Sequence, residues 1–268
     1  MTELDETRRA YWNERFRLHW GPEGAASVYM GRHCNAWRYR VRRVLFRRLV
    51  RRLGFAPGTL SVLDVGCGTG FYLQQWQTLG VASMAGLDIS DWVVAKLARA
   101  YPSATFYRAN VGAADSPLRA AAFDAVTALD VLVHLVDDGS YSRALENLHP
   151  SLIPGGYLLY SGAISHGPEK QFEDYWRGRS LATVATAMDA TGFEVVLRVP
   201  MSALMAAPPD TRHRQRNRRI WDAYMAPVRR WDSIGFLFGA LLFPAELLPV
   251  CTLKESPAIE IMVCRKRS

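Results

Sequence analysis

The chain has 268 residues, of which 49% are hydrophobic and 22% are charged, and its formal net charge is +8. This is an ordinary globular composition with enough length for one large domain or two small ones, and it excludes collagen, coiled coil and wholesale disorder. The N-terminal stretch is charged from its third residue, so we expect no signal peptide and a cytoplasmic location.

No metal-binding or disulfide pattern stands out. The four cysteines lack CxxC or cysteine–histidine spacing, and we expect them to be free thiols in a reducing compartment: Cys34, Cys67, Cys251 and Cys264. Asp137 and Asp138 are neighbouring acids before a predicted helix, so we interpret them as a helix cap and a surface residue. We therefore predict no metal ion.

The positive charge is unevenly distributed along the chain. Between Glu23 and Asp64 there is no acid, but there are nine arginines, eight of them within 38–52. A second run, 212–219, holds five arginines. Apolar residues in the first run recur at helical spacing, which predicts a helix that buries one stripe and exposes its arginines. Nucleic acid, an anionic membrane surface and an acidic substrate are all compatible with such charge.

Strands alternate with helices through the middle of the chain. Apolar runs bounded by turn residues predict seven strands, at 60–65, 84–90, 105–110, 123–132, 155–163, 193–200 and 258–266. Helical patterns follow most of them, at 71–79, 91–101, 140–152 and 179–192. Continuous apolar strands between amphipathic helices predict an α/β fold whose parallel sheet is covered on both faces, with ligands bound at the carboxyl ends of the strands.

Two segments lie outside this alternation, and we expect both to be helical. They divide the chain into an N-terminal arm or cap, 1–55, a catalytic domain, 56–199 plus 258–268, and a lid insert, 200–257, next to the substrate site. The insert contains the most apolar run, 234–250, which carries Pro244, Glu246 and Pro249. Because this run is shorter than the roughly 20 residues of a membrane span, we interpret it as packed or interfacial.

Three glycines at alternate positions follow the first predicted strand, in VLDVGCGTG (62–70). A glycine-rich turn between a strand and a helix lets backbone amides approach a ligand closely. The spacing is GxGxG rather than the GxGxxG of dinucleotide sites. Asp88, at the end of the second strand, can accept hydrogen bonds from ribose hydroxyls. The loop and this acid together indicate an adenosine-type ligand without requiring a pyrophosphate.

Four motifs in order resemble the class I S-adenosylmethionine-dependent methyltransferases, in particular bacterial O-methyltransferases of small molecules and sugars: VLDVGCGTG (62–70), GLDIS (86–90), FDAVTALDVLVHL (123–135) and LIPGGYLLYSG (152–162). The resemblance covers 60–199, and the last predicted strand matches the family's antiparallel seventh strand. It implies a Rossmann-like doubly wound sheet, six strands parallel and the last antiparallel, with S-adenosylmethionine as methyl donor. A Rossmann-like domain for another nucleotide is the alternative.

The resemblance also assigns roles to individual residues. Those expected to bind the cofactor are Asp64, Gly66, Cys67, Gly68, Gly70, Asp88, Ile89, Asn110, Val111, Leu129, Asp130 and Tyr29. Those considered for catalysis are His134, His166 and Asp130. A histidine beyond the fourth strand can serve as a general base, or it can be structural or touch the cofactor. For Asp130 the alternative is a cap on the following helix. The aromatics Trp12 and Phe16 are interpreted as core packing.

The acceptor is expected to be a hydroxyl of a small molecule or of a sugar or glycan, and the arginines of 212–219 are compatible with an anionic one. N-methylation of a small amine and RNA methylation are the alternatives. Nucleic acid is disfavoured because no RNA-binding module is recognisable and because ALDVLVHL stands where base N-methyltransferases often carry an NPPY-type motif. We interpret the arginine runs as solvated helix faces and the apolar run 234–250 as the core of the lid. The alternatives for 234–250 are a peripheral membrane contact and a homodimer contact.

Overall fold

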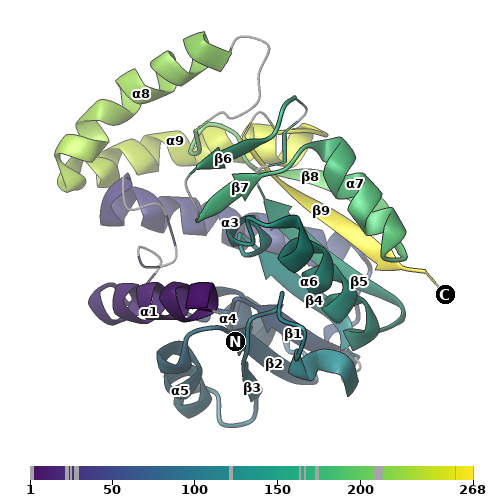
Figure 1. The fold of residues 1–268 in the computed structure, drawn as a ribbon. Helices are drawn as coiled ribbons and strands as arrows, with labels where there is room; N and C mark the ends of the chain where they lie inside the picture. Colours follow the sequence, from purple (N-terminus) through teal and green to yellow (C-terminus); the bar gives the residue numbers. More distant parts are fainter. Residues whose placement is uncertain are drawn as a thin grey trace.

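A seven-stranded sheet forms the centre of the computed structural model, which describes residues 3–21, 24, 26, 30–120, 123–162, 164–165, 167–172, 175–207, 214–256 and 258–267 (Figure 1). The strand order is β3-β2-β1-β4-β5-β9-β8. The strands are β1 Ser61–Val65, β2 Ser83–Asp88, β3 Thr105–Arg108, β4 Phe123–Leu129, β5 Leu152–Gly162, β8 Phe193–Ser202 and β9 Ile259–Lys266. Only β9 is antiparallel to its neighbours in this sheet, β5 and β8, so the predicted arrangement is confirmed.

Four helices connect the parallel strands, and capping side chains fix where three of them begin. They are α4 Phe71–Leu79, α5 Asp91–Ala100, α6 Asp138–Ser151 and α7 Leu181–Ala190. Ser90, Asp137 and Ser180 cap α5, α6 and α7 by accepting hydrogen bonds from backbone N–H groups of the first turn. The predicted capping role of Asp137 is therefore confirmed. The chain order reverses between β1 and β4, which creates a topological switch point at the carboxyl ends of the strands.

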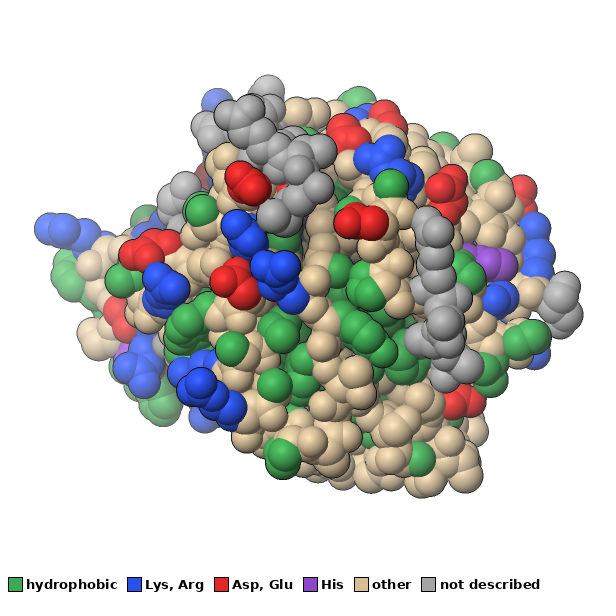
Figure 2. Space-filling view, turned by 60° about the horizontal axis from the view of Figure 1, so that its bottom comes forward, with side chains coloured by type: hydrophobic (Ala, Val, Ile, Leu, Met, Phe, Trp, Pro, Cys, Tyr) green, Lys and Arg blue, Asp and Glu red, His purple; other side chains and the backbone are tan. Residues whose placement is uncertain are grey.

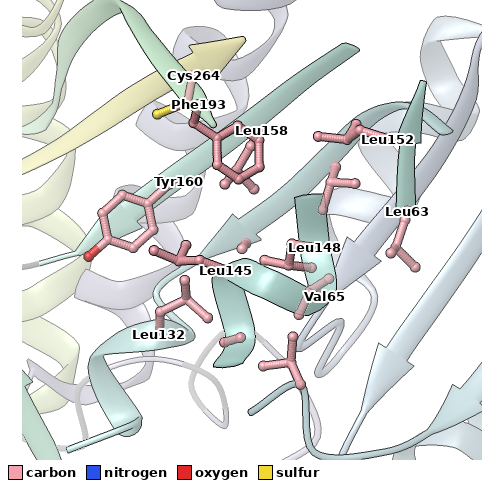
Figure 3. Packing of buried hydrophobic residues seen from close by; sticks show 14 of the residues in the cluster. Leu63, Val65, Leu132, Leu145, Leu148, Leu152, Leu158, Tyr160, Phe193 and Cys264 are labelled. Atoms are coloured by element: carbon pink, nitrogen blue, oxygen red, sulfur yellow. The ribbon is translucent and has the colours of Figure 1, made fainter. Parts of the chain in front are cut away.

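Both faces of the sheet are buried, as the continuous apolar strands require. On one face, Leu63, Leu158 and Phe193 pack with residues such as Leu145 and Leu148 from α6 (Figure 3). On the other face, side chains of the helices α3, α4 and α9 form a second cluster centred on fully buried Trp76. The sheet is therefore held rigidly between two layers, and its strand ends are fixed in space.

The N-terminal arm is helical, with α1 at Glu3–Leu18 and α3 at Gly31–Arg52. The predicted apolar stripe of α3 is present, because Val41, Leu45 and Leu49 are buried. The prediction that the arginines of α3 are exposed is wrong in part, since Arg38 and Arg42 are 8% and 7% exposed. Both side chains extend α3's buried face, where Arg38 donates to the side-chain oxygen of Asn35 and Arg42 donates to Asp130.

The insert before β9 is also helical, with α8 at Arg214–Arg230 and α9 at Asp232–Thr252. The helix α9 has 21 residues, so it is longer than the apolar run that the sequence suggested. By length and composition it could cross a membrane, with a mean hydropathy of 1.9. A short hairpin, β6 Lys170–Phe172 and β7 Trp176–Gly178, follows β5 and was not predicted. Short 3-10 helices lie at Pro57–Thr59, Pro117–Ala120 and Leu132–His134.

Candidate cofactor and substrate site

The glycine loop leaves β1 in a left-handed backbone conformation that favours glycine. Gly66 has φ +62°, and a Cβ built there would stand 2.4 Å from Cγ2 of Val131. Gly68 has φ +49°, and its missing Cβ would meet the ring of Phe16 from α1 at 3.4 Å. A side chain at Gly66 would therefore clash, and one at Gly68 would fill space between the loop and α1. The glycines keep this space open at the switch point.

Asp88 ends β2 and holds the loop from beside it. Its carboxylate accepts hydrogen bonds from the N–H of Gly68 at 2.8 Å and from the N–H of Ser90 at 2.9 Å. Burial raises the pKa of Asp88 to about 6, against the lowering effect of these backbone donors. The acid thus shapes the loop and also lines the cleft beside it.

Asp64, in β1, lies behind the loop and is 2% exposed. Its Oδ1 accepts a hydrogen bond of 2.6 Å from the hydroxyl of Thr127 in β4. Its Oδ2 is buried and has no hydrogen-bond partner among the residues that the structure describes. Burial raises the pKa of Asp64 to about 7. A buried carboxylate oxygen without a donor is suited to a cationic group, but Asp64 itself is not among the residues that line the cleft above the loop.

A cleft opens above the loop, with about 1000 Å³ of empty space including its mouth. Nine of the residues predicted from the sequence line it together: Gly66, Cys67, Gly68, Asp88, Ile89, Asn110, Val111, Leu129 and Asp130. His134 lines it as well. Hence residues predicted from the loop after β1, the ends of β2 and β3, and the segment after β4 meet in one site.

Other predicted residues are placed differently. Gly70 lies behind the loop at the start of α4, where a Cβ would meet the side chain of Leu97 at 2.9 Å. The amide of Asn110 donates to Asp5 of α1 at 2.7 Å, so in this structure its N–H group is engaged with the arm. Tyr29 and His166 lie outside the described residues. Their roles, like those of the other site residues, stay predictions.

His134 ends the short helix after β4 and is held by the β6–β7 turn. Its Nδ1 lies 2.7 Å from the carbonyl oxygen of Tyr175. Because a carbonyl oxygen can only accept, Nδ1 carries the ring proton and donates it, and Nε2 is left as an acceptor. The ring of Trp12 meets the imidazole edge-on at 5.1 Å. Burial lowers the pKa of His134, which keeps the ring neutral near pH 7.

Asp130 is held by an ion pair that the sequence did not reveal. Its Oδ2 lies 2.5 Å from Nη2 of Arg42, and its backbone N–H donates to the hydroxyl of Ser161 at 2.8 Å. The side chain does not cap a helix, since Asp137 caps α6. Although its burial raises the pKa, the charges and hydrogen bonds of Arg42 outweigh this, so the pKa of Asp130 lies below the ordinary value.

Several lining residues were missed by the sequence interpretation, chiefly Arg8, Tyr39 and Arg42. Arg42 continues the buried stripe of Leu45 and Leu49 at helical spacing, which is the signal that could have revealed it. Trp12 and Phe16, interpreted as core, also line the cleft. Two buried groups of the lining, Nε and Nη2 of Arg8 and the hydroxyl of Tyr72, have no hydrogen-bond partner within the described part of the chain.

The family model of a methyltransferase domain matches residues 62–156, which hold the loop, Asp88 and His134. An O-methyltransferase of Aspergillus nomiae is 31% identical over 171 residues, 57% of this chain and 74% of the relative. The chain belongs to the class I S-adenosylmethionine-dependent methyltransferases. The members of this family use S-adenosylmethionine as methyl donor, which is the ligand expected for the loop and Asp88.

Other relatives widen the range of acceptors. A tRNA U34 carboxymethyltransferase of Methylococcus capsulatus is 27% identical over 230 residues, 79% of this chain and 65% of the relative. The chain spans about half the length of most of the curated relatives it matches first. Among solved structures, magnesium protoporphyrin IX methyltransferase of Synechocystis with bound S-adenosylmethionine is 20% identical with a TM-score of 0.55, covering 74% of this chain and 90% of that one. This likeness concerns the fold alone.

Proposed function

We propose that this methyltransferase transfers the methyl group to a hydroxyl of a small molecule or of a sugar or glycan, with His134 as general base. The observation that carries the proposal is the hydrogen bond from Nδ1 of His134 to the carbonyl oxygen of Tyr175. It leaves an unprotonated Nε2 on a ring that lines the cleft. A hydroxyl is a weak nucleophile until a base removes its proton, whereas a neutral amine needs no such help. The presence of O-methyltransferases among the relatives supports the same acceptor class.

The residues present fit the cofactor. The carboxylate of Asp88 is suited to the ribose hydroxyls, and Ile89 supplies an apolar contact for the adenine. The unpartnered Oδ2 of Asp64 suits the ammonium of the methionine part, and the unpartnered N–H groups of Arg8 suit a carboxylate, whether on the cofactor or on the acceptor. When bound, S-adenosylmethionine supplies an electrophilic methyl group. The chain's own part is to position the acceptor, exclude water and take up its proton at Nε2 of His134.

Formation of S-adenosylhomocysteine from S-adenosylmethionine, followed over a panel of hydroxylated metabolites and glycans, tests the proposal. With an accepted substrate, His134→Asn should lower kcat/KM by about 10²–10⁴-fold at unchanged cofactor affinity. The matched control is His149→Asn, because His149 lies at the far end of α6 against Phe193 and does not line the cleft. It should keep full activity. Full activity of His134→Asn would overturn the role of this base, and methylation of amines alone would move the acceptor to the N-methyl class.

The pH profile gives a second readout. Because burial lowers the pKa of His134, the acid limb of kcat/KM should have its midpoint below the ordinary histidine value of about 6.5. This limb should disappear in His134→Asn while the cofactor still binds. If the acid limb of kcat/KM keeps the same midpoint in His134→Asn, a group other than His134 is responsible for it.

RNA methylation is the second candidate, favoured by the relative that acts in tRNA modification and aligns with 79% of the chain, and by the net charge of +8. Transfer of label from S-adenosylmethionine to total tRNA tests it. A labelled nucleoside formed at physiological salt would support this candidate. If tRNA binding weakens steeply with added salt and no labelled product forms, the interaction with tRNA is non-specific electrostatic attraction.

A further inference from the structure

The helix α9 presents an apolar face away from the rest of the protein. Leu237, Leu241 and Leu248 are 66%, 76% and 68% exposed, and Pro244 between them is exposed as well. Their spacing of four, three and four residues places all four on one side of the helix. We call this surface, Leu237, Leu241, Pro244 and Leu248, the α9 face. Large leucines exposed in a row are uncommon on a protein surface that contacts only water.

The opposite side of α9 is fixed to the protein. Glu246 is fully buried and accepts hydrogen bonds from the hydroxyl of Ser202 at 2.6 Å and from the N–H groups of Ala203 and Leu204 at 2.8 and 2.6 Å. Near its start, α9 lies so close to α3 that a Cβ on Gly239 would be 2.2 Å from the ring of Trp37. The helix is therefore held along the protein surface, although its length and hydropathy are those of a membrane span.

Cationic side chains surround the α9 face. On α3, the exposed Arg40 stacks 3.9 Å above the ring of Trp37, and the exposed Arg48 donates to the backbone of α9 at the carbonyl of Cys251. Arg230 precedes the helix and Lys254 follows it, both exposed. Basic, acidic and hydrophobic side chains lie together at the left edge of Figure 2, the side to which the ends of α8 and α9 project in Figure 1.

The acids next to this surface do not cancel its charge. Asp232 accepts from the backbone N–H of His33 at 3.2 Å and keeps its negative charge, whereas Glu255 pairs with Arg198 at 3.1 Å. The single charge of Asp232 is outnumbered by the four cationic side chains named above. The helix α3 contributes no acid at all. At the α8–α9 turn, Trp231 is 55% exposed, and tryptophan is a residue type favoured where water meets lipid headgroups.

We propose that the α9 face docks on an anionic lipid bilayer, with α9 lying in the plane of the interface. The leucines would enter the boundary between headgroups and acyl chains, and the surrounding arginines and lysine would contact lipid phosphates. A second copy of the chain fits less well, because pairing two such faces across a twofold axis would bring their cationic rims together. The inference does not depend on the acceptor or on His134.

Vesicle flotation of the whole chain tests the proposal, with vesicles of phosphatidylcholine alone and of phosphatidylcholine mixed with phosphatidylserine. The protein should float with the mixed vesicles and much less with the neutral ones, and added salt should weaken the binding. The double substitution Leu237→Glu and Leu241→Glu should lower the partition coefficient by about tenfold or more for each leucine. Arg40→Gln should lower it by about fivefold on anionic vesicles only.

The matched control is Leu18→Glu, because Leu18 is also 66% exposed but stands at the end of α1. It should float like the parent protein. Circular dichroism and cofactor binding should be unchanged in all variants, which shows that they are folded. Absence of flotation with the parent protein would overturn the proposal. The proposal would also be overturned if the parent protein does not float, is dimeric by light scattering, and becomes monomeric when Leu237 and Leu241 are replaced. The α9 face would then be a contact between two copies of the chain.

Discussion

The ion pair of Arg42 and Asp130 should contribute more to stability than any surface pair of this protein. The guanidinium is 8% exposed and the carboxylate 30% exposed, with 2.5 Å between Nη2 and Oδ2. Removing one partner of a buried pair costs about 3–5 kcal/mol, because the other charge is left desolvated. Since Asp130 retains some contact with solvent, we expect Asp130→Asn to lower the free energy of unfolding by about 3 kcal/mol, near the low end of that range.

Asparagine is the right substitution because the backbone of Asp130 is left-handed, with φ +60°. Asparagine tolerates this conformation, whereas alanine would add strain of about 1–2 kcal/mol that has nothing to do with charge. Urea unfolding of the parent, Asp130→Asn, Arg42→Met and the double variant gives the coupling energy between the two positions, which should be about 2 kcal/mol. Arg40→Gln is the control, since Arg40 is an exposed arginine two residues from Arg42 and therefore on the opposite side of α3.

The pH dependence of the same measurement separates charge from packing. Arg42 lowers the pKa of Asp130, so the pair's contribution is fully present above the unfolded aspartate pKa of about 3.9. It is lost as the pH falls through the lower folded value. The difference between parent and Asp130→Asn should therefore shrink below about pH 4. A loss under about 1 kcal/mol at pH 7, or additive effects of the two substitutions, would refute this account of the pair.

Three further predictions concern the cofactor site and α9. Asp88→Asn should weaken S-adenosylmethionine binding about tenfold to a hundredfold in calorimetry, because it removes a charged acceptor; unchanged affinity in a folded variant would exclude its role. Because burial raises the pKa of Asp64 to about 7, a bound cation should lower it, and titrations near pH 6.5 in buffers of different ionisation enthalpy should show proton release that Asp64→Asn abolishes. Glu246→Gln should cost about 2–4 kcal/mol and speed hydrogen exchange in α9, as an amide cannot accept from all its donors; unchanged exchange would contradict its anchoring role.

The alternation of strands and helices, the loop after β1 and the position of Asp88 could be predicted from the sequence because each depends on nearby residues. An apolar run predicts a buried strand, a serine or aspartate before a helical pattern predicts a helix cap, and three closely spaced glycines predict a tight turn. The same reasoning placed Asp88 and His134 at the same edge of the sheet, since parallel strands present their carboxyl ends on one edge.

The partners of the site residues could not be predicted in this way. The pair Arg42–Asp130 joins residues 88 positions apart, and the acceptor for His134 is a backbone oxygen in a hairpin whose strands have three residues each. Local patterns carry no information about such contacts, which depend on how the arm and the hairpin pack over the sheet. An arginine run is ordinarily solvated, and Arg42 can be buried because Asp130 pairs with it.

These contacts share one consequence for the enzyme. Three elaborations of the sheet contribute to the cleft: α1 supplies Trp12 against His134, α3 supplies Arg42 against Asp130, and the β6–β7 turn supplies the carbonyl of Tyr175. The core strands present the loop and the acids, while these three elaborations orient His134 and Asp130. Differences in acceptor among relatives with the same fold should therefore lie in the arm and the hairpin, and substitutions there should change the acceptor's KM while the affinity for S-adenosylmethionine follows Asp88 and the loop.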